Sequence, residues 1–172
     1  MRRVSVRKSK GSQSPFTADP FSPITILTGY SGTGKTYLAC AFAAEALNSA
    51  DIMSIRIMRS AVASRDIGFL PGTEAEKMAA YERPYVDTFN TIFGRGDAYS
   101  LLKQKGILTF ESSSFQRGMT YKNPFIIVDE IQNMTFQELY SIVTRISEGS
   151  RLIFCGDPRQ TDLAKGSGFD RF

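Results

Sequence analysis

The chain has 172 residues, of which 42 % are hydrophobic and 22 % are charged, and its formal net charge is +4 at pH 7. This length suits one domain with a hydrophobic core rather than two, and because no apolar run could span a membrane, we expect no membrane partner. Histidine is absent, which excludes Ser-His and Cys-His catalysis and histidine-based zinc sites.

The N-terminal segment, residues 1–22, is predicted to be a basic, flexible lead-in to one domain that spans residues 23–172. Its first ten residues, MRRVSVRKSK, contain five basic residues and no acidic residue. Such a segment is typical of a solvated chain end, and it is also suited to attracting a polyphosphate such as RNA or DNA. Because the sequence stops soon after KGSGF, we expect a C-terminally shortened or minimal form of the domain.

Apolar runs alternate with helix-forming segments along the rest of the chain. Strands are predicted at residues 24–28, 51–58, 107–110, 125–128 and 151–155. Helices are predicted at residues 36–50, at 74–93 with an interruption at Pro84, at 97–104, and after a capping box at Thr135–Glu138. Loops are expected at residues 60–73 and 112–123. This alternation indicates an α/β domain with a mostly parallel sheet flanked by helices.

The two cysteines, Cys40 and Cys155, are far apart in the sequence and lie in apolar segments. Their spacing does not resemble that of a metal site. We therefore predict buried, reduced thiols and a reducing compartment, the cytoplasm.

The sequence GYSGTGKT matches the phosphate-loop pattern G-x-x-x-x-G-K-[ST], between a predicted strand and a predicted helix. Its glycines allow a tight turn that points backbone N–H groups at phosphate oxygens, and the helix adds the positive end of its dipole. Lys35 is placed to reach the β- and γ-phosphates, and the Thr36 hydroxyl to ligate Mg²⁺. An ordinary glycine-rich turn is the alternative. The predicted nucleotide contacts are Gly29, Tyr30, Ser31, Gly32, Thr33, Gly34, Lys35 and Thr36.

Two further strand ends carry candidate catalytic residues. Asp129 follows the apolar run FIIV, where it can hold the Mg²⁺ shell, and Glu130 is placed to orient or deprotonate the attacking water. Adjacent carboxylates are common at strand ends, so this interpretation depends on the phosphate loop. After the strand at 151–155, Gln160 is a candidate contact of the γ-phosphate or its water, supported by Asp157. A simple Gly-Asp-Pro turn is the alternative there.

These motifs make the chain similar to the PhoH family of phosphate-starvation-inducible ATPases, which resemble the core of superfamily 1 helicases. The GFLPG and VDE-Q-N segments are the most specific. The resemblance implies a P-loop NTPase domain with a RecA-like core that binds and hydrolyses ATP with Mg²⁺. The matching segments run in family order through nearly all of residues 24–169: GYSGTGKTYLA, IMRSAV, GFLPGTEAEKMAAY, FQRGMTYKNPFIIVDEIQNMT, TRISEGSRLIFCGDPRQTDL and KGSGF.

The resemblance also implies action on RNA or single-stranded DNA and assembly into a homo-oligomer such as a ring. By matching position, Arg59 lies in a segment that contacts nucleic acid in helicase relatives, and Arg117 lies in a family loop. Arg145 is either an arginine finger that reaches a neighbour's nucleotide or a charge that compensates a helix dipole. The sequence departs from the family at residues 13–23, where three prolines are incompatible with the expected adenine-contacting helix, leaving Gln13 as the candidate contact.

The leading functional hypothesis is an ATPase coupled to RNA or DNA, with helicase-like remodelling. The alternative is a nucleotide-dependent switch with little intrinsic hydrolysis, and stimulation of turnover by nucleic acid would separate the two. A small-molecule kinase also has a phosphate loop, but it fits the GDPRQ strand end poorly. Several aromatic residues are interpreted as core rather than as base-stacking residues: Tyr81, Tyr85, Tyr99, Phe110, Phe115 and Tyr121.

Overall fold

The computed structural model describes residues 22–60, 73–112, 123–144, 146–157, 159–160 and 168. Within this part of the chain, five parallel strands form one sheet in the order β1-β5-β4-β2-β3. The strands are β1 (Ile24–Thr28), β2 (Ser54–Arg59), β3 (Leu108–Ser112), β4 (Pro124–Asp129) and β5 (Arg151–Gly156). The helices are α1 (Lys35–Asn48), α2 (Glu74–Phe93), α3 (Ala98–Gln104), the short 3-10 helix η3 (Ile131–Asn133) and α4 (Phe136–Val143). The predicted α/β fold is confirmed.

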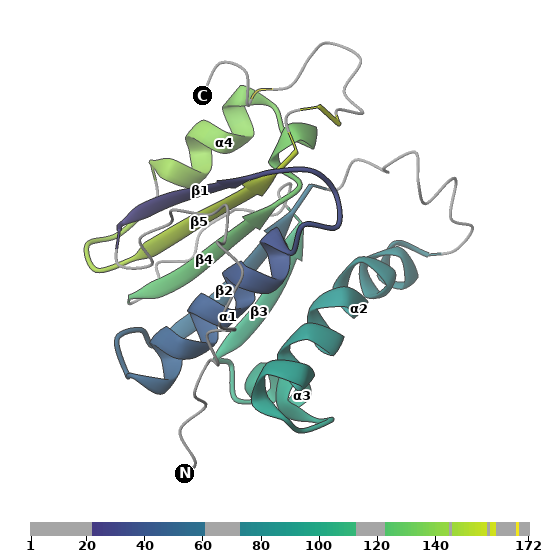
Figure 1. The fold of residues 1–172 in the computed structure, drawn as a ribbon, viewed down its shortest axis with the longest axis vertical. Coiled ribbons are helices and arrows are strands. Elements are labelled where there is room, and N and C mark those ends of the chain that lie inside the picture. The colour runs from purple at the N-terminus through teal and green to yellow at the C-terminus, as the bar shows by residue number, and fades with distance from the viewer. Residues whose placement is uncertain are drawn as a thin grey trace, which may run out of the picture.

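Helices cover both faces of the sheet (Figure 1). On one face, α1, α2 and α3 form a hydrophobic core with inward-pointing side chains of all five strands. On the other face, η3 and α4 form a second core around Val128, Leu139 and Phe154. All six residues of β4 are buried because both of its faces are covered, which is typical of a central strand in a parallel sheet.

Helix α2 is continuous, so the predicted interruption at Pro84 is wrong. The helix begins at a capping box formed by Thr73 and Glu76 and packs against α1 and α3. A proline removes only one helical N–H donor, and the cap and tertiary packing maintain the helix across it.

The other predicted elements agree with the structure apart from their ends. β2 begins later than predicted because Ala50 adopts a left-handed conformation with a φ of 60°, so the chain turns before the strand starts. The predicted capping box between Thr135 and Glu138 is present at α4. Cys40 and Cys155 are buried free thiols, as predicted.

Three predicted segments fall largely or wholly outside the described residues: the N-terminal lead-in and the loops at 60–73 and 112–123. Among the helices that the structure describes, none has both the length and the apolar character that crossing a membrane requires.

Candidate functional site

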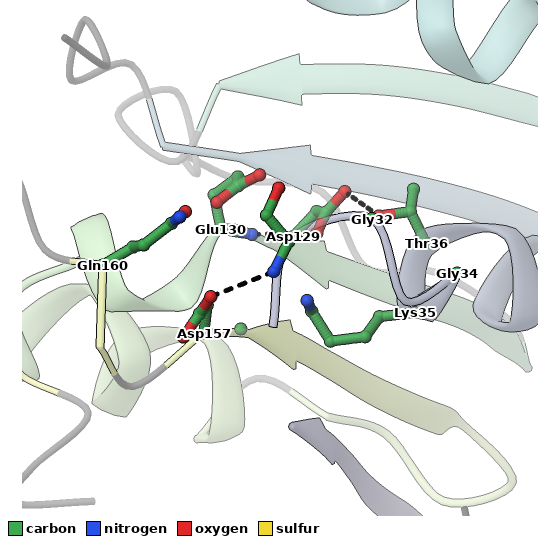
Figure 2. Close-up of a pocket in the computed structure, with 10 residues that line it drawn as sticks. Gly32, Gly34, Lys35, Thr36, Asp129, Glu130, Asp157 and Gln160 are labelled. Carbon is green, nitrogen blue, oxygen red and sulfur yellow. Dashed lines mark hydrogen bonds between the residues drawn. The ribbon is translucent and has the colours of Figure 1, made fainter. Parts of the chain in front are cut away.

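A cavity of about 290 Å³ lies where the carboxyl ends of β1, β4 and β5 meet. Figure 2 shows side chains from these three strand ends around it. Because β5 lies between β1 and β4, the segment after β1 and the acidic pair after β4 are separated by one strand. The cavity is lined by Ser31, Gly32, Gly34, Lys35, Thr36, Asp129, Glu130, Gly156, Asp157 and Gln160. The structure therefore brings together all three predicted motifs.

The predicted phosphate loop connects β1 to the N-terminus of α1. Gly32 and Gly34 have φ angles of 76° and 84°, in the left-handed region that favours glycine. The Lys35 ammonium donates hydrogen bonds to the carbonyl oxygens of Gly29 and Tyr30, both at 2.8 Å. The first N–H groups of an α-helix and a lysine together attract anions, so this loop is suited to phosphate groups.

Thr36 and Asp129 meet at the cavity. The Thr36 hydroxyl donates to Asp129 Oδ2 at 2.9 Å (Figure 2). The other carboxylate oxygen, Oδ1, accepts from the backbone N–H of Glu130 at 3.0 Å. A hydroxyl and a carboxylate are the hard oxygen donors that Mg²⁺ prefers, and Mg²⁺ commonly combines one or two such protein groups with substrate phosphates. The side chains at this point therefore fit the predicted magnesium ligands.

Glu130 has an unusual backbone conformation, with a φ of 57°, as it leaves β4. Its Oε2 accepts a hydrogen bond from Gln132 Nε2. Burial raises the pKa of Glu130 above its ordinary value, and the negative charge of Asp129 raises it further. The charges of Arg59 and Lys35 and the Gln132 hydrogen bond lower this pKa in opposition. A carboxylate with a raised pKa is a better proton acceptor, which suits the predicted role.

The end of β5 links the phosphate loop to Glu130 through hydrogen bonds. Asp157 Oδ2 accepts from the backbone N–H of Ser31 at 3.1 Å. The backbone N–H of Asp157 donates to Gln132 Oε1 at 3.1 Å, and Gln132 in turn donates to Glu130. Gln160 lines the same cavity and is exposed.

Gly156 lies where β5 passes closest to η3. A Cβ atom at this position would lie 2.6 Å from Ile131 Cγ1 and 3.2 Å from Gln132 Oε1. Any other residue would therefore require the Ile131 side chain to shift.

Of the three arginines predicted to have functional roles, the structure describes one, Arg59. Arg59 ends β2 and is paired in register with Asp129 of β4. Its guanidinium carbon lies 5.1 Å from the centroid of the Tyr81 ring, and its charge acts on Glu130 as described above. Contact between Arg59 and nucleic acid stays a prediction. Arg117 and Arg145 lie outside the described residues.

Two residues of the site have contacts that the sequence did not predict. Tyr85 is buried in the core, as expected, but its hydroxyl also donates to Asp129 Oδ2 at 2.7 Å. No sequence spacing connects these residues, because the contact depends on how α2 packs. The sequence position of Gln132, just after the acidic pair, is a weak indication that it belongs to the site. Its hydrogen bonds to Asp157 and Glu130 cannot be derived from that position.

A parallel sheet with a phosphate loop after its first strand and an acidic pair after a buried strand defines a P-loop nucleotide-binding domain. A family model described as PhoH-like protein matches residues 10–171. The chain therefore belongs to the PhoH family, as its motifs predicted.

Relatives in several bacteria are similar to this chain. A PhoH-like protein of Bacillus subtilis (strain 168) is 36 % identical over 160 residues, which cover 92 % of this chain and 50 % of that protein. Protein PhoH of Escherichia coli (strain K12) is 38 % identical over 141 residues, which cover 81 % of this chain and 40 % of that protein. A PhoH-like protein of Mycobacterium leprae (strain TN) is 38 % identical over 140 residues, with the same two coverages of 81 % and 40 %. The chain thus spans half or less of the length of these curated relatives.

Proposed function

We propose that this protein binds and hydrolyses ATP with Mg²⁺ and couples hydrolysis to RNA or single-stranded DNA. The observation that carries the proposal is the meeting of Thr36, Asp129 and Glu130 at one cavity beside the phosphate loop. Membership of the PhoH family supports a nucleotide-binding, P-loop NTPase-like protein. The identity of the nucleotide, its hydrolysis and the coupling to nucleic acid are what we add.

Each residue has a defined task in this proposal. Lys35 and the backbone N–H groups of the loop bind the β- and γ-phosphates, because they combine positive charge with inward-pointing donors. Thr36 and Asp129 hold the ion, which when bound neutralises charge on the phosphate oxygens. Glu130 orients a water and accepts its proton. Gln160 contacts the γ-phosphate or that water from the end of β5.

Coupling to nucleic acid is supported by the resemblance to helicase cores. The basic lead-in, together with Arg59 and Arg117, offers positive charge for phosphate backbones. We also propose that the protein forms a homo-oligomer, in which Arg145 completes a neighbour's site as an arginine finger. The two free thiols are in keeping with a cytoplasmic location.

One observation favours a second candidate, a nucleotide-dependent switch. Two groups that would contact phosphate are engaged with the protein itself: the Lys35 ammonium donates to loop carbonyls, and the Ser31 N–H donates to Asp157. Nucleotide binding must replace these hydrogen bonds, so it would change the loop and the end of β5 together. A switch uses that change without efficient turnover.

The deciding experiment is steady-state phosphate release by the full chain from ATP and Mg²⁺, alone and with single-stranded RNA or DNA. Lys35→Ala serves as the blank, because it removes the phosphate-binding ammonium. Lys35-dependent release that rises with nucleic acid supports the coupled ATPase. Nucleotide binding without Lys35-dependent release favours the switch. Absence of nucleotide binding would refute both.

A further inference from the structure

Tyr85 reaches the site from the hydrophobic core. It lies on α2, its side chain is fully buried, and it does not line the cavity. Its ring packs against Phe110 with the centroids 5.4 Å apart, so neighbouring side chains hold its orientation. From there its hydroxyl donates to Asp129 Oδ2 at 2.7 Å. Helix α2, none of whose residues is among the described lining of the cavity, is thus bonded directly to a predicted magnesium ligand.

The hydrogen bonds of Asp129 are distributed unequally between its two oxygens. Among the described residues, Oδ2 accepts from both Thr36 and Tyr85, whereas Oδ1 accepts from the backbone N–H of Glu130 alone. Each carboxylate oxygen has about two acceptor positions. The two hydroxyls fill the acceptor positions of Oδ2. Oδ1 has one position left, and this position can bind a cation.

The bond from Tyr85 also fixes the orientation of the carboxylate. Without it, the carboxylate would keep the hydrogen bonds from the Thr36 hydroxyl and the Glu130 N–H, and its rotation about the Cβ–Cγ bond would be less restricted. A hydrogen bond from a neutral hydroxyl to a carboxylate is among the stronger ones in proteins. The Thr36 hydroxyl donates its proton to the same oxygen, which leaves its own lone pairs for the ion.

We propose that Tyr85 is a positioning residue for the magnesium site, which holds Asp129 so that Oδ1 and the Thr36 oxygen face the cation. This inference rests on the proposed function, because it assumes that the cavity binds a nucleotide with a divalent cation. It gives α2 a role at the site, because Tyr85 links the hydrophobic core to Asp129.

Tyr99 provides a matched control. It is also buried, and its hydroxyl donates to a carboxylate, Glu82 Oε1, at the same distance of 2.7 Å. Tyr99 lies on α3 and lines a different cavity with Glu82 and Lys103. Tyr85→Phe and Tyr99→Phe therefore each delete a hydroxyl that donates to a carboxylate, but only the first deletion touches Asp129.

The test measures Mn²⁺ binding to the full chain with saturating ADP by electron paramagnetic resonance. We expect Tyr85→Phe to weaken Mn²⁺ binding about ten-fold and Tyr99→Phe to leave it unchanged. ADP binding without a metal should be the same in both variants and in the wild type. Equal Mn²⁺ affinity in Tyr85→Phe and the wild type would overturn the inference alone, as would equal weakening in both variants. A wild type that binds no ADP would refute the proposed function as well.

A second measurement applies if Tyr85→Phe does not fold. In the otherwise wild-type chain, 3-fluorotyrosine is placed at position 85 or, as control, at position 99, and ¹⁹F spectra are recorded with ADP before and after adding Mg²⁺. We expect Mg²⁺ to shift the signal at position 85 and not the signal at position 99. An unshifted signal at position 85 would overturn the inference.

Discussion

The two sides of the cavity differ in how firmly the protein holds them. On one side, hydrogen bonds of 2.7 and 2.9 Å join Asp129 to Tyr85 and Thr36, and Asp129 is only 4 % exposed. On the other side Gln160 is exposed, and the guanidinium of Arg159 lies against a Tyr30 ring that is 57 % exposed. Buried hydrogen bonds fix the side chains of the first side, whereas the side chains of Gln160 and Tyr30 on the second side are exposed. We therefore expect the largest effects from substitutions on the side that contains Asp129, which is called the held side below.

The largest effect should come from Glu130→Gln, which keeps the size of the side chain but removes the proton acceptor. We expect turnover to fall about 1,000-fold, since general bases contribute roughly 10²–10⁴-fold, with nucleotide affinity nearly unchanged. Single-turnover phosphate release and equilibrium nucleotide binding measure the two quantities. Normal turnover in this variant would show that another group activates the water.

Lys35→Ala should have the next largest effect, on binding itself. The ammonium makes charge-assisted contacts in the proposed complex, and their loss should reduce ATP affinity about 100-fold. The melting temperature should change little, because within the described part of the chain the hydrogen bonds of Lys35 go to carbonyls of its own loop. Titration calorimetry measures the affinity, and a change smaller than about three-fold would contradict the assigned role of the lysine.

Gln160→Ala tests the exposed side. We expect turnover to fall about ten-fold, less than for Glu130→Gln, because an exposed side chain is poorly preorganised. ATP affinity and the melting temperature should match those of the wild type. A lowered melting temperature would mean that this side is held as firmly as the other, and the contrast between the two sides would then be wrong.

The smallest effect is expected at Cys40 and Cys155, which should not react with an alkylating reagent in the native protein. Burial raises the pKa of both Cys40 and Cys155 above the ordinary value, and the charge of Asp129 adds to this. A raised pKa keeps each thiol protonated and unreactive, so iodoacetamide should not modify the native protein at pH 8. In denaturant the pKa returns to its ordinary value of about 8.5, and both thiols should react. Rapid modification of the native protein, followed by mass spectrometry, would show that the held side opens.

The sequence predicted those features that depend on neighbouring residues. The β-branched run at residues 24–28 predicts β1, and the run FIIV predicts that Asp129 lies at a strand end, as the structure shows. The contact of Tyr85 with Asp129 was beyond sequence reasoning because it joins residues 44 positions apart through tertiary packing. Pro84 shows the opposite problem, since a valid local rule predicted an interruption that tertiary packing overrides.

Gly156 limits how closely the end of β5 can approach η3. A Cβ atom added at this residue would lie 2.6 Å from Ile131 Cγ1, so the space between the strand end and η3 is too small for a methyl group. Helix η3 carries Gln132, which bonds to both Asp157 and Glu130. A displacement of the β5 end toward η3 would therefore act on Gln132 through this close approach as well as through hydrogen bonds.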